Sequence, residues 1–294
     1  MTFEYDVQPS VWRYFHTPGF RKALNVYEAS NREVRNYITD AIERYEKNPS
    51  PNINAAGMLE RLIKIDKNIG IVMAEDMLLA GVDSTSTAVT SVLYSLAKNP
   101  DKQEKLREEI LTILPEKNSK LTPTSFDSVP YLRAVIKESL RVQPVTNGNT
   151  RTLNHDTVLQ GYRVPKDVNF KFDEILGNSN KLSFQTDIFL PGSLLAFDED
   201  QFKRSREFIP ERWLKNNKDP KCPHAKDAHP FTYLPFGFGS RMCIGRRFAE
   251  IEIEVLTTRI VREFQLDWHH ADLNYKSSVI NLPNSPLKLQ FNEI

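Results

Sequence analysis

The sequence predicts a mainly α protein with a small β region. Apolar residues recur at helical spacing through most of the first 142 residues and again after residue 245. Short β-like segments separated by Pro, Asn and Asp fill residues 147–230. The 294 residues are 40% hydrophobic and 26% charged, which is typical of a globular protein with a sizeable core. The sequence contains no internal repeat.

The first two helices are expected over residues 20–48 and about 58–98. The first ends at the proline-containing stretch KNPSPN. The second is expected to break near Asn68 or Gly70 and to stop before Pro100, because a residue that precedes proline resists helical geometry.

Two shorter helices follow. DKQEKLREEILTIL, residues 101–114, has charged residues on one face and apolar residues on the other. Residues 130–142 form the next helix, since Pro130 is tolerated in a first turn and Pro144 ends the helical pattern.

The β region and a last helix complete the expected elements. TVLQGYRVP and DIFLPGSLLAF have β-like composition, a long helix covers about residues 245–264, and VINLP and LKLQF are short apolar strands.

Bulk properties exclude several classes of protein. The 39 basic and 38 acidic residues nearly cancel, so the sequence gives no sign of a nucleic-acid partner. The longest apolar stretch, from Ile69, is interrupted by Glu75 and Asp76, which predicts a buried helix rather than a membrane span. Two cysteines are too few for a disulfide framework and favour a reducing compartment or one special thiolate. MTFEYDVQPSVWRYF has neither secretory nor transit-peptide character.

The stretch PFGFGSRMCIGRRFAEIEIE places one of these cysteines, Cys243, between glycines and the start of the last helix. A lone cysteine is usually a small buried apolar residue. Here, however, the helix N-terminus stabilises a thiolate and the glycines let the backbone approach a bulky group. The neighbours that matter are Phe236, Gly237, Gly239, Arg241 and Gly245.

Other cysteine chemistries fit the spacing poorly. A phosphatase-type cysteine needs an arginine at the position of Ala249, and a dinucleotide loop needs a glycine at the position of Met242. A zinc site could recruit Cys222, His224 and His229, but their spacing to the loop cysteine matches no compact ligand pattern.

FGFGSRMCIG resembles the haem-binding loop of the cytochrome P-450 family, the haem-thiolate monooxygenases, whose pattern is Phe-x-x-Gly-x-Arg-x-Cys-x-Gly. All five fixed positions agree: Phe236, Gly239, Arg241, Cys243 and Gly245. The resemblance implies that residues 1–294 are one partial domain, the C-terminal part of the cytochrome P-450 fold, with the haem-thiolate loop and its helix at 235–264. It also implies that Cys243 is the axial ligand of the iron in haem b. Arg241 and Arg151 would pair with the haem propionates.

A second motif of the family stands in the helix over residues 130–142. KESLR places Glu138 and Arg141 three residues apart on one helix face, which is often no more than a surface ion pair. The resemblance implies a buried structural cluster of both residues with Arg212 of PERW.

A third motif, AGVDSTSTAVT, stands in the helix over residues 58–98. Its Ser and Thr hydroxyls could simply bond to the preceding turn. The resemblance instead places it over the oxygen-binding face of the haem, where Asp83 with Ser84 or Thr85 would deliver protons. Ser84 stands where the family usually has threonine.

Basic residues suggest the electron donor. Arg246 and Arg247 after the loop, with Arg133 and Lys137 on the preceding motif helix, resemble the mitochondrial branch, which a small acidic ferredoxin serves with NADPH-derived electrons. A solvated basic face is the alternative. The opening QPSVWRYFHTPGFRKALNVYEASNREVRNYI resembles insect members of this branch. The implied location is the matrix side of the mitochondrial inner membrane; the alternative is a flavoprotein reductase at the endoplasmic reticulum membrane.

Two departures from the family remain. By comparison with the family, we expect the chain to lack the first third or more of a complete member, including the targeting segment and the membrane-contacting elements. Residues 169–186 are an atypical insertion, either an irregular loop or a retained intron. The expected function is insertion of one oxygen atom of dioxygen into a small apolar organic substrate. The alternative is a non-catalytic fragment without a complete haem and substrate pocket.

Overall fold

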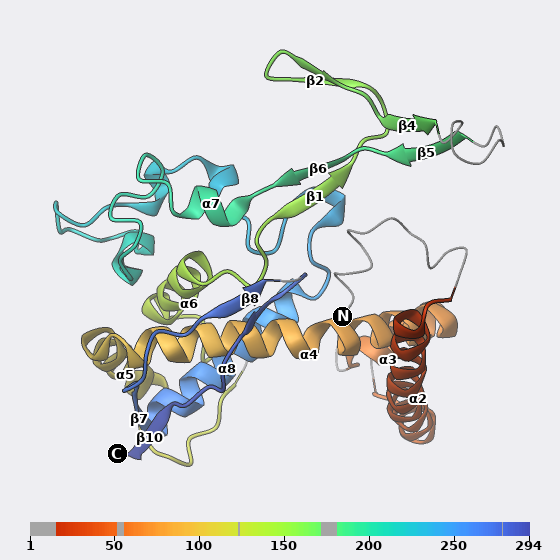
Figure 1. Ribbon diagram of the computed structural model, residues 1–294. Helices are drawn as coiled ribbons and strands as arrows, with labels where there is room; N and C mark the ends of the chain where they lie inside the picture. The colour runs from red at the N-terminus through yellow and green to blue at the C-terminus, as the bar shows by residue number, and fades with distance from the viewer. Residues whose placement is uncertain (1–15, 52–55, 123, 172–180, 278) are drawn as a thin grey trace.

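The structure is a computed structural model that describes residues 16–51, 56–122, 124–171, 181–277 and 279–294. Figure 1 shows α4 running through the molecule, with α5, α6 and α8 around one half and α2 and α3 at the other end. The helices are α2 (Pro18–Lys47), α3 (Met58–Ile65), α4 (Lys67–Ala97), α5 (Pro100–Ile113), α6 (Pro130–Val142), α7 (Gly192–Ala196) and α8 (Arg246–Glu263).

The β region consists of antiparallel pairs within the described residues. The pairs are β1 (Asn149–Thr152) with β6 (Asp187–Leu190), β2 (Thr157–Leu159) with β3 (Tyr162–Val164), β4 (Asp167–Lys171) with β5 (Lys181–Gln185), β7 (Phe264–Asp267) with β10 (Gln290–Glu293), and β8 (Tyr275–Ser277) with β9 (Asn281–Pro283). The prediction of a mainly α protein with a small β region is confirmed. Four short 3₁₀ helices also lie in the described residues: η2 (Pro210–Trp213), η3 (Ala225–Asp227), η4 (Pro230–Thr232) and η5 (Gly239–Arg241).

The main hydrophobic core lies where α4, α5, α6 and α8 meet. Val92, Leu106, Leu132, Val135 and Val261 are completely buried there. Burying such side chains stabilises the fold by about 1.5–3 kcal/mol each relative to exposure. The core therefore holds in place the helices that carry the sequence motifs.

Side chains at the helix ends explain where α4 and α6 begin. The Asp66 carboxylate accepts hydrogen bonds from the amides of Asn68 and Ile69, so the expected long helix is two helices that meet at residue 66 rather than at 68–70. At the start of α6, the Glu109 carboxylate accepts from the amides of Tyr131 and Leu132 at 2.9 and 2.8 Å.

Two parts of the β region differ from the expectation. DIFLPGSLLAF is a strand only up to Leu190, because Pro191 ends β6 and α7 follows. Residues 169–186, expected to be an irregular loop or a retained intron, begin and end in paired strands, β4 and β5, in which Asn169 lies opposite Ser183. Residues 172–180 of that segment lie outside the described part of the chain.

Candidate functional site

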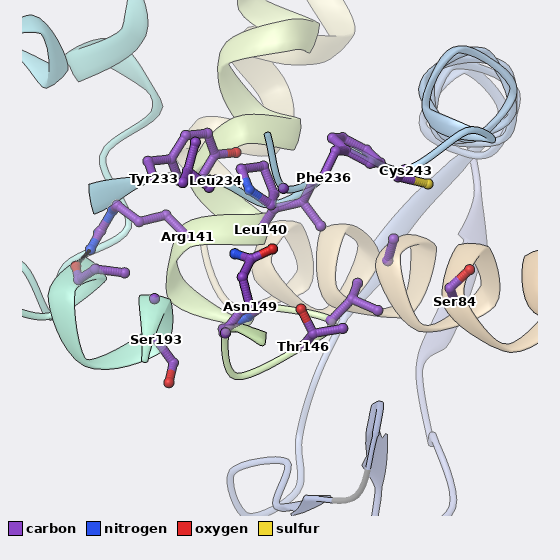
Figure 2. Close-up of a pocket in the computed structure, with 18 of the residues that line it drawn as sticks. Ser84, Leu140, Arg141, Thr146, Asn149, Ser193, Tyr233, Leu234, Phe236 and Cys243 are labelled. Carbon is purple, nitrogen blue, oxygen red and sulfur yellow. Dashed lines mark hydrogen bonds between the residues drawn. The ribbon is translucent and has the colours of Figure 1, made fainter. Parts of the chain in front are cut away.

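A cavity of about 360 Å³ lies between α4, the segment after α6 and the loop that precedes α8 (Figure 2). Its volume falls in the range of small-molecule sites. Its lining includes Ser84, Thr85, Ala88, Leu140, Thr146, Phe236, Arg241, Cys243 and Ile253. Figure 2 shows Cys243 on one side and Ser84 of α4 on the other.

The backbone of the cysteine loop, residues 235–245, depends on two glycines. Gly237 and Gly239 have φ of +69° and +70°, a left-handed conformation that other residues adopt only with strain. The Cys243 amide donates to the Phe236 carbonyl at 2.8 Å, which closes the loop. The thiol of Cys243 is left exposed immediately before α8.

The start of α8 adds electrostatic support for an anion at Cys243. Gly245 is the N-cap of α8 and gives its free amides no side-chain acceptor. Free amides at a helix N-terminus stabilise negative charge close to them. Arg241 also lines the cavity, is exposed and forms no ion pair within the described residues.

The α4 side of the cavity is formed by Ser84, Thr85 and Ala88. The Ser84 hydroxyl donates to the Ala80 carbonyl at 2.8 Å, so it bonds to the preceding turn. Asp83 is exposed and does not line the cavity, because successive helix residues point about 100° apart. The structure therefore brings Ser84 and Thr85 to the cavity with Cys243 and leaves Asp83 outside.

The charged residues of the second motif lie together behind the cavity. Glu138 and Arg141 are completely buried and Arg212 is 2% exposed. The Glu138 carboxylate accepts from both arginines, from the Trp213 indole and from the Ile209 amide, at 2.8–3.0 Å. We call Glu138, Arg141, Arg212 and Trp213 the Glu138 cluster.

The remaining N–H groups of the two guanidinium groups in the Glu138 cluster donate to backbone carbonyls. Arg141 donates to the carbonyls of Ala196, Ser205 and Glu207. Arg212 donates to those of Lys203 and Arg204. Burial lowers the pKa of Arg212, and the charge of Glu138 opposes that shift. The cluster thus joins α6 to the chain that leads into η2.

Arg151 contacts the cysteine loop from β1. Its guanidinium donates to the Phe238 carbonyl at 3.1 Å and lies 5.1 Å from the centre of the Phe238 ring. Arg151 is therefore placed to hold the loop, beside the cavity rather than among its lining residues.

The four basic residues expected to meet an electron donor are exposed on α6 and α8. Arg133 pairs with Glu254 at 2.9 Å and Arg246 pairs with Glu250 at 2.8 Å. Partial burial of the Lys137 ammonium group lowers its pKa, and the charge of Arg133 adds to the effect. Arg247 forms no ion pair with any described residue. This face is therefore only partly neutralised.

The zinc alternative finds no support in the described part of the chain, where no group of three His, Cys, Asp or Glu residues could hold a metal ion. Cys222 is buried, and the His229 Nδ1 atom accepts from the Phe231 amide. None of the helices in the described ranges has the length and apolar character needed to span a membrane.

Sequence reasoning missed Asn149 and Asn281. Asn149 lines the cavity, and a Cβ atom at Gly237 would lie 2.9 Å from its Oδ1 atom. Asn281 is 6% exposed and bonds to the segment after α6. An asparagine within the apolar run VINLP was the available signal, because a buried amide requires hydrogen-bond partners.

The sequence matches the family described as "Cytochrome P450" over residues 3–173 and 174–291. It is 45% identical to "Cytochrome P450 CYP12A2" of Musca domestica over 98% of this chain and 52% of that protein. It is 43% identical to "Probable cytochrome P450 12a5, mitochondrial" of Drosophila melanogaster, again over 98% of this chain and 52% of that protein. The chain thus spans about half the length of the curated relatives it matches.

A comparison with solved structures agrees on the fold. The crystal structure of a cytochrome P450 (CYP102L1) matches with a TM-score of 0.70 at 24% identity. The match covers 94% of this chain and 58% of that one.

Proposed function

Because this chain belongs to the cytochrome P450 family, we propose that it forms the haem-binding part of a monooxygenase. The reaction would insert one atom of dioxygen into a small apolar organic substrate. The observation that carries the proposal is the exposed Cys243 thiol at a cavity whose other side is formed by Ser84 and Thr85.

The residues around the cavity fit a haem group. A cysteine thiolate is an established haem ligand, and Cys243 lies beside the N-terminus of α8. Ala88, Leu140 and Ile253 supply apolar lining for a flat macrocycle. Arg241 of the cysteine loop and Arg151, which bonds to that loop, would pair with the two propionates.

The bound haem would supply the activation of dioxygen. Cys243 would donate electron density to the iron. Ser84 or Thr85 would hold a proton at the cavity, and the exposed Asp83 carboxylate would exchange protons with water on the outer side of the same turn. Ser84 can release its bond to Ala80 by rotating about a single side-chain torsion, which is freer than that of threonine.

The names of relatives and the basic face support a proposal for the electron donor and the location. A relative from Drosophila melanogaster has "mitochondrial" in its name. We infer a mitochondrial location at the matrix side of the inner membrane, with NADPH-derived electrons delivered by an acidic ferredoxin to Arg133, Lys137, Arg246 and Arg247. A flavoprotein reductase at the endoplasmic reticulum is the competing donor.

We also propose that residues 169–186 are an insertion relative to the family. The two family matches meet between residues 173 and 174, inside this segment, which supports the proposal. Sequencing of the mature transcript tests its origin. A transcript without the segment would identify a retained intron, and continuous spliced reads through it would identify a genuine loop.

The function is tested by expressing the chain with haem, reducing it and adding carbon monoxide. We expect the Soret band of a thiolate-ligated haem, lost in Cys243→Ser and kept in Cys222→Ser, since Cys222 is buried away from the lining of the cavity. If the unaltered chain shows no such band, the non-catalytic fragment is the correct description.

A further inference from the structure

The segment after α6 forms one side of the cavity. We call residues 144–150 the wall segment, because Pro144, Val145, Thr146, Gly148, Asn149 and Thr150 all line the cavity. Figure 2 shows Thr146 and Asn149 on this side. The first residues of this segment lie outside helix and strand, so their backbone carbonyls need partners from elsewhere in the fold.

Asn281 of β9 supplies those partners. Its amide N–H donates to the Val145 carbonyl at 2.8 Å. Its side-chain Nδ2 atom donates to the Pro144 carbonyl at 2.8 Å and to the Asn147 Oδ1 atom at 3.0 Å. Its Oδ1 atom accepts from the Ser277 hydroxyl at 2.9 Å. Both Nδ2 hydrogens of this nearly buried side chain are donated in hydrogen bonds. Asn281 alone therefore bonds to three residues of the wall segment.

Further bonds from the β8–β9 hairpin reinforce this attachment. The Asn147 Nδ2 atom donates to the Ser277 hydroxyl at 3.1 Å, and the Tyr275 hydroxyl donates to the Gln143 Oε1 atom at 2.9 Å. Three polar side chains of the hairpin therefore bond to the chain over residues 143–147.

The other side of the wall segment has little room to move. A Cβ atom at Gly148 would lie 2.1 Å from the Leu190 carbonyl oxygen of β6. The Ser193 amide donates to the Asn147 carbonyl at 3.0 Å. The wall segment is thus held between the hairpin on one side and β6 with α7 on the other.

We propose that Asn281 is a positioning residue that fixes the wall segment and thereby decides which substrates the cavity accepts. Only the last step, substrate choice, rests on the proposed function. Without the Asn281 amide group, the Pro144 carbonyl and the Asn147 side chain lose their donors in a partly buried place. The wall segment would then move relative to α4, because a buried carbonyl without a donor costs free energy that exposure to water relieves.

The first experiment uses the chain without haem and measures amide hydrogen exchange. Asn281→Asp keeps the shape of the side chain but removes the Nδ2 donors. We expect exchange at the Ser193 amide and in peptides covering the wall segment to accelerate about tenfold, the effect of losing two partly buried hydrogen bonds. Exchange at the Leu132 amide, bonded to Glu109, stays unchanged.

The matched control is Asn292→Ala in β10. Asn292 also donates from Nδ2, but to the Asp267 carboxylate at 2.7 Å rather than to the wall segment. We expect no acceleration in the wall segment of this variant. Equal exchange in Asn281→Asp and unaltered chain would overturn the proposal.

Ser277→Ala provides a milder change should Asn281→Asp fail to fold. It removes the hydroxyl shared by Asn281 and Asn147. We expect about threefold faster exchange at the same amides, and no change would count against the role of the hairpin.

The second experiment uses haem-loaded chain and the ratio of dissociation constants for imidazole and a bulky phenylimidazole. We expect Asn281→Asp to change this ratio about fivefold while the thiolate Soret band stays in place. An unchanged ratio would overturn the role in substrate choice. If the unaltered chain has no Soret band, the proposed function fails, whereas the exchange experiment still decides whether Asn281 fixes the wall segment.

Discussion

The Glu138 cluster and the cysteine loop lie on neighbouring parts of the structure, but the polar groups of the cluster are buried whereas the thiol of the loop is exposed. In the cluster, a carboxylate and two guanidinium groups are enclosed, and each is matched by hydrogen bonds. In the loop, the Cys243 thiol is exposed, and Arg241 has no ion-pair partner within the described residues. Arg141 also lines the cavity, so the enclosed cluster directly supports the exposed site.

The difference separates stability from chemistry. Groups that hold the fold have all their partners within the chain, so their removal exposes buried charge. Groups available to a ligand have free bonding capacity, so their removal costs little stability.

The largest effect is expected at the centre of the cluster. Glu138→Gln leaves the buried guanidinium groups of Arg141 and Arg212 without a counter-charge, which should lower the free energy of unfolding by about 3–5 kcal/mol. Urea denaturation measures it. The control Glu207→Gln removes an exposed ion pair with Arg204 and should change the unfolding free energy far less than Glu138→Gln does. Equal losses in both variants would contradict the separation.

A smaller loss is expected from the backbone of the cysteine loop. Gly239→Ala forces a side chain into a φ of +70° in open space, at a cost of about 1–2 kcal/mol. Gly81→Ala, within α4 and also in open space, should instead stabilise the chain by about 0.5–1 kcal/mol. Thermal unfolding of the two variants compares them, and shifts of the same sign would show that φ does not control the loop.

Glu211 lies in η2, next to Arg212 of the Glu138 cluster, and forms ion pairs with Lys102 and Lys105. Its carboxylate makes the stability of the fold depend on pH. Burial raises its pKa, but the hydrogen bond from Lys105 and the charge of Lys102 outweigh burial and hold the pKa below 4.5. The ionised carboxylate therefore adds to the free energy of unfolding at pH values above its pKa in the unfolded chain. This stabilisation is lost as the pH falls through its pKa in the folded chain. Glu211→Gln should cost about 1 kcal/mol at neutral pH and nothing in acid. Urea denaturation of the variant and the unaltered chain at neutral and at acidic pH measures this cost. The same difference in stability at both pH values would contradict the prediction.

The smallest effect on stability is expected at Arg247. Its side chain is exposed without an ion pair in the described residues, so Arg247→Ala should change the unfolding free energy by less than about 0.5 kcal/mol. Binding of an acidic ferredoxin at low salt should nevertheless weaken about threefold. Arg206→Ala, another arginine away from α6 and α8, is the control. Equal weakening by both variants would argue against a docking role.

Local covalent geometry explains which parts of the fold could be predicted. The boundaries of α6 agree with the sequence because Pro130 and Pro144 act on their immediate neighbours. The break at Asp66 was expected two to four residues later, since its capping bonds become visible only once the helix is built. The pairing of Asn149 with Leu190 joins distant segments, and no local pattern determines it.

The candidate site divides in the same way. The five fixed positions of the cysteine loop lie within ten residues, so a sequence pattern can contain them all. The outward position of Asp83 and the bond of Arg151 to the loop carbonyl depend on how α4 and β1 pack. Asn281 contributes to the cavity only through segments more than 130 residues away, which sequence spacing cannot connect.

The difference in exposure between the two cysteines also allows the fraction of folded chain to be measured by thiol labelling. Cys222 is buried, and burial raises the pKa of its thiol, whereas Cys243 is exposed. A maleimide should therefore label one sulfur per folded chain and two per unfolded chain. Occupation of Cys243 by iron would remove the remaining native label, so counting labels distinguishes folded, unfolded and cofactor-loaded molecules in a single sample.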